Sequence, residues 1–343
     1  MTSTQTASSR AALHVATAKF RTPTLVASFA QMASAFVPLI ALYIALYAGV
    51  IYGVPYWALF GLSVLAAAFT VRIFIFQHDC GHGSFFRSTR ANQAVGLLCS
   101  RGTLTPYESW RRQHAGHHLH WNDLDNRNSG TDIYSTCLTV EEYKALPPMR
   151  RLFYRVIWHP IVSLAVLPPL VFLVLYRLPF DMPSSWIRER RSVIVTNIAL
   201  ALMFGTLIAI FGWRTVALVH LPTASMAAMM GVWMFSLQHR FDGALWAREG
   251  AWTSETASLS GSSHLVLPRV LQWFTGNIGY HHIHHLDPRV PNYRLEDCHR
   301  SDPAFAEAPT VTLRQGLSAM RYCLWDEERQ TLIRMPPLTM KAA

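Results

Sequence analysis

Long apolar stretches dominate the chain and define its predicted elements. Four of them reach the roughly 20 residues that a helix needs to cross a bilayer, and they cover residues 26–50, 57–76, 193–211 and 215–237. The turns inside each pair are short, since residues 51–56 carry no charge and residues 212–214 carry one. The pattern therefore predicts four transmembrane helices arranged in two hairpins.

Two further apolar stretches are predicted not to cross. Residues 161–176 are interrupted by Pro168 and Pro169 and have several arginines on both sides. Because arginine-rich flanks favour the cytoplasm, this segment should dip into the membrane and return, or lie at the interface. Residues 94–104 are too short to span and contain Arg101, which suits an interfacial helix.

The even number of crossings places three segments on one side of the membrane, namely the N-terminus, residues 77–191 and residues 238–343. The positive-inside rule makes that side the cytoplasm. We expect an all-α polytopic protein of a bacterial inner membrane, with both termini and a histidine-rich cap in the cytoplasm. The expected organisation is a tail over residues 1–24, a membrane domain over 25–300 and a tail over 301–343.

Composition agrees with a membrane protein. The chain is 51% hydrophobic and 15% charged, which is too little charge for an ordinary soluble surface. Its net charge of +10 would suggest nucleic acid on a soluble domain, but beside apolar spans it indicates topology-setting residues and contacts with anionic lipids. We therefore expect membrane lipids and no nucleic acid as partners. The five cysteines are scattered, which predicts reduced thiols, and Cys80 should be a packing residue.

Three histidine clusters carry the candidate chemistry. The first is His78 with His82, where the second span ends, and the other two are H-x-x-H-H patterns over residues 114–118 and 281–285. On a helix, positions i, i+3 and i+4 share one face. Each cluster can thus direct its imidazoles at a common ion, and His239, just after the last span, is a further candidate.

The number of nitrogen ligands indicates two metal ions. Imidazole suits zinc, copper, iron and nickel, and no thiolate pair favours structural zinc. Eight or nine ligands exceed one tetrahedral site and match two ions with four or five each. Iron is the leading candidate, because a redox pair can activate dioxygen and zinc cannot.

The sequence resembles the membrane fatty acid desaturases, specifically the acyl-lipid omega-6 (delta-12-like) branch of bacteria and plants. The resemblance rests on HDCGH, HAGHH and HHIHH in this order, on FQHDCGHGSFF around the first box and on LQWFTGNIGY before the third. It covers roughly residues 25–300. It implies a di-iron centre, with no catalytic residue beyond the metal ligands, bound by His78, His82, His114, His117, His118, His239, His281, His284 and His285.

Some positions depart from that set or lie beside it. Phe235 stands four residues before His239, where some acyl-CoA desaturases have a polar residue, so a water-mediated metal contact is doubtful there. We assign His282 and His120 to supporting positions, although their contribution and that of His264 stay open. Ligand histidines often donate their second ring N–H to a carboxylate. Six acidic residues near the boxes could accept it or could be loop charge: Asp79, Asp123, Asp125, Asp132, Glu255 and Asp287.

The implied reaction uses dioxygen as co-substrate and two external electrons to form a cis double bond in a fatty acyl lipid. An unactivated methylene has no acidic proton, so acid–base side chains alone cannot remove its hydrogens. The chain carries no flavin or nicotinamide fingerprint and no His-Pro-Gly-Gly haem motif. A separate electron donor is therefore expected, ferredoxin-type by preference and cytochrome b5-type as the alternative.

Two other functions remain open from the sequence. Hydroxylases, ketolases and related enzymes that act on hydrocarbons or carotenoids share the boxes, although the omega-6-like flanks favour desaturation. A non-catalytic metal-binding or transport protein would place ionisable residues along a pathway inside its spans. Apart from Arg72 and His220, the predicted spans have almost none.

Overall fold

The computed structural model describes residues 13–127, 137–180 and 182–337. Within these ranges four helices are long and apolar enough to cross a membrane: α2 (Leu25–Ile51), α3 (Tyr56–His82), α9 (Ile187–Phe211) and α10 (Trp213–His239). The predicted spans and both hairpins are confirmed. The helices extend beyond the apolar stretches: α3 continues past residue 76 to carry the first histidine box, and α9 begins six residues before the predicted span.

Helix α3 is the centre of the membrane bundle. About 61% of its most apolar window is buried, compared with 17–28% for the other three spans, and it packs against α2, α10 and α4 (Thr89–Gly102). The outer spans expose large apolar side chains such as Val26, Leu202 and Ile210, at 82%, 69% and 65%. Contiguous apolar surface of this kind needs lipid around it. The protein is therefore an integral membrane protein.

The described part of the segment that links the two hairpins contains several short helices, and none of them is a straight transmembrane helix. Helix α5 (Tyr107–His120) follows α4, and beyond residue 137 come α6 (Val140–Ala145), α7 (Pro148–Ile157), the π-turn η1 (Val162–Val166), α8 (Leu167–Leu173) and the 3-10 turn η2 (Leu175–Arg177). The axis bends by 61° between α7 and the η1–η2 segment. Tyr154 on α7 donates its hydroxyl to the Cys323 carbonyl, and Arg190 at the start of α9 donates to the Met182 carbonyl. The bend shows that this segment is not one straight transmembrane helix, and it fits either a re-entrant segment or a broken span.

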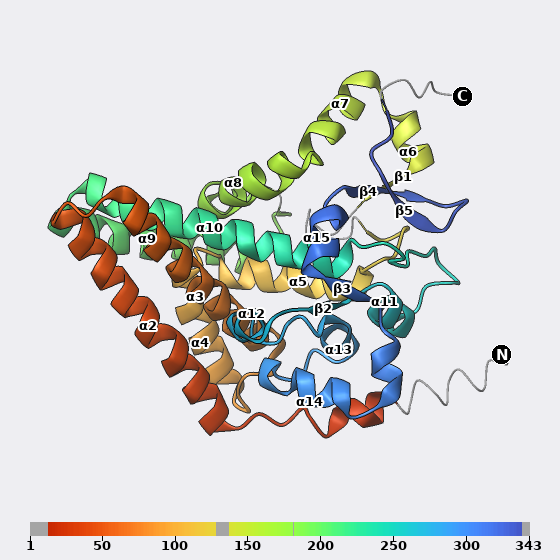
Figure 1. The fold of residues 1–343 in the computed structure, drawn as a ribbon, viewed down its shortest axis with the longest axis horizontal. Coiled ribbons are helices and arrows are strands. Elements are labelled where there is room, and N and C mark those ends of the chain that lie inside the picture. Colours follow the sequence, from red (N-terminus) through yellow and green to blue (C-terminus); the bar gives the residue numbers. More distant parts are fainter. Residues whose placement is uncertain (1–12, 128–136, 181, 338–343) are drawn as a thin grey trace.

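The remaining elements form a cap at one end of the bundle, opposite the turns that join α2 to α3 and α9 to α10 (Figure 1). Its helices are α11 (Ser254–Ser260), α12 (Arg269–Phe274), α13 (His281–Leu286), α14 (Leu295–Arg300) and α15 (Leu313–Ala319), with 3-10 turns η3 (Asn292–Arg294) and η4 (Pro303–Glu307). All three segments that the parity argument grouped together reach this end.

Short strands, which the sequence pattern did not predict, join distant parts of the cap. Strand β1 (Leu138–Thr139) is parallel to β4 (Tyr322–Asp326), which pairs antiparallel with β5 (Thr331–Arg334). Strand β2 (His264–Val266) is parallel to β3 (Thr310–Thr312). Residues 301–337 therefore pack on the cap and are anchored to the loops that follow α5 and α10.

Gly83 fixes the position where α3 ends. Its φ of 73° is left-handed, and its amide donates to the carbonyls of Asp79 and Cys80. This conformation is the usual end of an α-helix at glycine, because a side chain would be strained there. The helix thus ends at His82, and the chain turns away from the histidines at Gly83.

The topology can be tested by thiol labelling, because all five native cysteines are buried. Tyr52, in the α2–α3 turn, is 84% exposed, and the Arg329 side chain, between β4 and β5, is 77% exposed. We expect a membrane-impermeant maleimide to label Tyr52→Cys and Arg329→Cys from opposite sides of the membrane, compared in intact cells and inverted vesicles. Labelling of both variants from the same side would contradict the four-span arrangement.

Candidate metal centre

Nine imidazoles from four helices converge where the bundle meets the cap. Helix α3 supplies His78 and His82, α10 supplies His239, and α5 and α13 supply three each. The i, i+4 spacing puts paired rings on one helix face. Although α13 has only six residues, that is enough to present His281, His284 and His285 together.

The nine rings divide into two adjacent groups. Five belong to the first group: His78, His82, His114, His118 and His284. Four belong to the second: His117, His239, His281 and His285. Within each group the candidate ligand nitrogens all lie within 4.8 Å of one another. The rings of His118 and His285, one from each group, are stacked with centroids 4.3 Å apart, so two ions would be close neighbours.

The second group forms a closed square of imidazole nitrogens. The Nε2 atom of His239 lies 3.1 Å from that of His117 and 2.9 Å from that of His281. The Nε2 atom of His285 is 3.2 Å from that of His117 and 3.1 Å from that of His281. Each neutral imidazole that offers a lone pair here carries its proton on the other nitrogen. Four such lone pairs facing one another repel unless a cation lies between them.

The first group also brings imidazole nitrogens close enough together to need a cation between them. The Nε2 atom of His118 lies 3.2 Å from that of His114 and 3.0 Å from that of His284. The Nε2 atom of His82 is buried and has no hydrogen-bond partner among the described residues. A buried nitrogen without a partner is costly, and a metal ion in the group would satisfy it. The residues present therefore fit two ions held by five and four imidazoles.

Burial keeps these rings in the form that binds metal. Desolvation, followed by the charge of His78, lowers the pKa of His117 to about 3. Desolvation, with the charges of neighbouring histidines, also lowers the pKa of His114, His118 and His284 well below the usual value. Metal ligation requires neutral imidazole. These four rings are thus neutral at physiological pH and need no deprotonation before an ion enters.

Aromatic side chains pack around the cluster. The Trp110 ring is stacked on His114 at 4.9 Å, and Trp121 lies 4.0 Å from His239 between ring centroids. Phe235 contacts His117 and His239 at 5.1 and 4.9 Å. An apolar ring therefore occupies the place where a polar residue would be needed for a water-mediated contact. Trp121, which the sequence reasoning did not single out, directly follows the second box region.

Asp79, an acidic candidate from the sequence, directly supports a candidate ligand histidine. Asp79 Oδ1 lies 3.3 Å from His78 Nδ1, while its Oδ2 accepts hydrogen bonds of 2.8 Å from the backbone and side-chain amides of Asn292. This contact fixes the ring orientation and directs Nε2 toward the group. Asn292 was missed by the sequence reasoning, because its position after the third box has no motif.

The other carboxylates have different partners. Asp123 accepts from the backbone of Asp125 and Asn126, and Asp125 pairs with Arg248. Asp287 accepts hydrogen bonds of 2.7 Å from Thr17 and 2.5 Å from Arg21. It thereby anchors the segment before α2 to the end of α13. Glu255 lies 3.6 Å from His14 Nε2, and Asp132 lies outside the described residues.

Several residues near the motifs lie outside both groups. His282 Nε2 is 3.0 Å from His299 Nδ1, and the His264 ring lies 4.8 Å from His299, so these three form a separate cluster. His120 belongs to neither group. Cys80 is buried in the apolar core and is in neither group, as expected for a packing residue. His220 is hydrogen-bonded to the Tyr47 hydroxyl inside the bundle.

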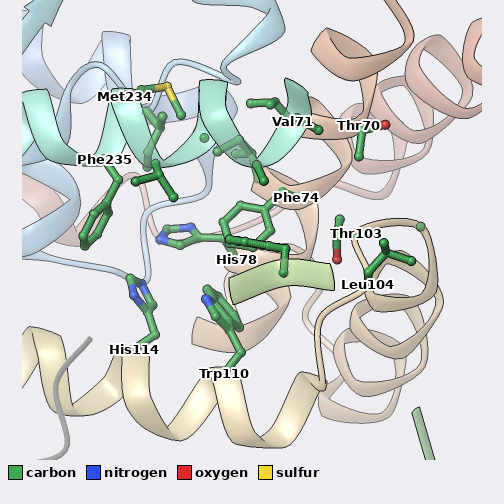
Figure 2. A pocket seen from close by; sticks show the side chains of 18 of the residues that line it. Thr70, Val71, Phe74, His78, Thr103, Leu104, Trp110, His114, Met234 and Phe235 are labelled. Carbon is green, nitrogen blue, oxygen red and sulfur yellow. The ribbon is translucent and has the colours of Figure 1, made fainter. Parts of the chain in front are cut away.

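An apolar cavity leads from the bundle to the histidines. Its walls come from α3, α5, α8 and α10, and its histidine end is formed by His78 and His114 from the first group and His281 from the second. Figure 2 shows Phe74, Trp110 and Phe235 around this end, with Thr103 and Leu104 farther along the cavity. The cavity therefore touches both groups, and most of its lining is apolar.

Comparison with known proteins identifies the family. The fatty acid desaturase family model matches residues 55–316, so the chain belongs to this family of oxidoreductases. A fatty acid desaturase of Bacillus subtilis is 38% identical over 316 residues, which cover 92% of this chain and 88% of the relative.

More distant relatives are named for particular lipid desaturations. An sn-1 oleoyl-lipid 12-desaturase of Synechocystis sp. is 29% identical, covering 74% of this chain and 71% of the relative. An sn-2 acyl-lipid omega-3 desaturase (ferredoxin) of Helianthus annuus is 28% identical, covering 70% and 53% respectively. The family resemblance seen in the boxes is thus confirmed over most of the chain.

Replacement of one histidine of the second group tests the proposed metal site. His117 contacts two other rings of its group, so we expect His117→Ala to abolish activity and to lower bound iron measured by elemental analysis. His14→Ala is the control, because His14 is 43% exposed on its side chain and lies in neither group. Equal iron in the two variants would refute the assignment of His117 as a ligand.

Proposed function

We propose that this protein introduces a cis double bond into the fatty acyl chain of a membrane lipid, with the delta-12 (omega-6) type as the specific activity. The supporting observation is the apolar cavity that ends at both histidine groups in a member of the desaturase family. The delta-12 assignment is supported by the omega-6-like flanks of the boxes and by the likeness to the cyanobacterial 12-desaturase.

The cofactor in this proposal is a pair of iron ions held by the nine histidines of the two groups. Bound there, the ions would supply the dioxygen activation and one-electron chemistry that no side chain in the cavity provides. Iron is preferred over zinc because the reaction is an oxidation, which a redox-inactive zinc ion cannot support. Asp79 and Asn292 act through His78, whose ring they hold in place.

The chain's own contribution to the reaction is placement of the acyl chain. Two adjacent methylenes lose one hydrogen each, while dioxygen, two external electrons and two protons yield two water molecules. Phe74, Trp110 and Phe235 line the cavity beside the histidines and keep water away from the reacting carbons. Orienting one carbon pair in a dry site accounts for specificity without any acid or base at the methylene.

Electrons come from a separate protein in this proposal, a ferredoxin-type donor by preference. The name of the relative from Helianthus annuus includes ferredoxin. A cytochrome b5-type donor is the alternative. Another hollow, on the cap side, reaches His82 and His114 and is lined by Arg111, Arg112 and Arg188. These arginines pair with the lining carboxylates Glu108 and Glu189, so the rim keeps an excess of one positive charge. This basic rim would attract an acidic donor to the place where the first histidine group lies nearest the surface. The proposal places this side in the cytoplasm.

Product analysis tests the activity. Expression in a host that makes only monounsaturated lipids, together with a ferredoxin and its reductase, should yield a new diene whose second double bond is at the delta-12 position. Gas chromatography with mass spectrometry of derivatised lipids would detect it. An unchanged acyl profile despite iron-loaded protein would count against desaturation, and a hydroxylated product would favour the related hydroxylase chemistry.

A matched pair of glycine substitutions tests the cavity. A Cβ added at Gly231 or at Gly205 meets no atom within 4 Å, and both residues are on membrane helices. Gly231 lines the cavity and Gly205 does not. We expect Gly231→Phe to fill the acyl path and reduce product at least tenfold with unchanged bound iron, while Gly205→Phe keeps both. Full activity of Gly231→Phe would show that the acyl chain takes another route.

A further inference from the structure

A third hollow, separate from the acyl cavity and from the hollow beside Arg111, lies on another side of α3. It has a volume of about 770 Å³ and is lined by residues of α2, α3, α12 and α14. Its charged side chains are Arg72, Arg269, Arg300 and Glu296. Three guanidinium groups and one carboxylate leave this hollow with an excess of positive charge, which the proposed reaction does not use.

Arg72 is the residue that makes the hollow unusual. It is in a membrane helix, six residues before His78, and is 3% exposed. Its Nη1 donates to the Trp273 carbonyl, and its guanidinium lies 3.9 Å from the Trp273 ring centroid. These contacts fix α12 but supply no negative charge, and the Arg72 Nε is buried without a hydrogen-bond partner among the described residues. A buried charge is costly unless it is paired.

The neighbouring groups do not neutralise Arg72. Glu296 is 2.5 Å from Arg300 and also accepts a hydrogen bond from Gln272, and within the described chain no ion pair joins it to Arg72. Arg269 is exposed and likewise has no ion pair among these residues. Arg72 and Arg269 therefore line the hollow without a carboxylate partner among the described residues, and their charges attract an anion to it.

The position of the hollow identifies the source of that anion. Val270 and Trp273 on α12 are exposed, at 67% and 41%, as expected for a helix lying at the membrane interface with tryptophan at headgroup level. Ala30 and Ser34 of α2 line the hollow, and Val37 follows on the same face with 64% exposure. A headgroup in the hollow would place its acyl tails along this apolar face.

We propose that the hollow formed by Arg72, Arg269 and the α2 and α12 helices binds the phosphate headgroup of an anionic membrane lipid. The binding site lies apart from the two histidine groups. Residues 276–280 connect the two regions, because Gly276 and Asn277 line the hollow and Ile278 lines the acyl cavity. The inference rests on the unpaired guanidinium groups and does not depend on the proposed reaction.

Binding of short-chain lipids to the purified full-length protein tests this site without any turnover measurement. The probes are short-chain phosphatidylglycerol, phosphatidylcholine with the same acyl chains, and inorganic phosphate, titrated by calorimetry below the lipids' micelle concentration. We expect saturable binding of phosphatidylglycerol and weaker binding of the other two. Arg269→Gln should weaken phosphatidylglycerol binding about fivefold, which is the usual effect of one arginine at an anionic lipid surface.

Further variants distinguish lipid binding in this hollow from general electrostatic attraction to the protein surface. Arg72→Met should weaken binding more than Arg269→Gln, and if it does not fold, Arg269→Gln alone decides. Arg329→Gln is the matched control, because that arginine is on the β4–β5 turn and outside the hollow. Equal affinity for inorganic phosphate, equal affinity for phosphatidylcholine, or the same loss in Arg329→Gln would overturn the lipid assignment. These outcomes leave the diene assay unaffected, so the two proposals can fail separately.

Discussion

The mutual repulsion of imidazole lone pairs is the constraint on which the rest of the structure depends. Nine rings face inward within two groups, and burial lowers the pKa of those on α5 and α13 so that protons do not separate them. Such an arrangement is stable only if the surrounding scaffold holds it or an ion enters. Helix α3 supplies the rigid part of that scaffold, since it is the most buried span and ends in the cluster.

The cap holds the remaining rings through contacts between distant segments. Asp287, directly after α13, binds Thr17 and Arg21, which lie more than 260 residues earlier. Asn292 binds Asp79, and β2 pairs with β3, so the chain on both sides of the third box is fixed. Because α13 has six residues, its own hydrogen bonds could not hold three histidines in place. Tertiary contacts therefore decide the geometry of the third box.

The features that could be predicted from the sequence are those that depend on local periodicity. Apolar length predicted α2, α3, α9 and α10, and the i, i+4 rule placed His78 and His82 on one face. Sequence reasoning could not predict how nine histidines divide into five and four, because neighbours in sequence such as His117 and His118 belong to different groups. The short parallel strands and Asn292 were missed for the same reason, since each depends on a partner far along the chain.

Helix α3 borders two different environments, an apolar cavity on one face and a polar hollow on another. Val71, Phe74 and Ile75 line an apolar cavity, whereas Arg72 lines a polar hollow one position away. The separation is thin: a Cβ on Gly276, whose φ is 54°, would come within 2.9 Å of the Ile75 side chain. Only glycine combines this backbone conformation with so close an approach. The loop that leads into the third histidine box is therefore packed directly on α3, and the positions of the acyl cavity, the hollow and the metal centre are fixed relative to one another.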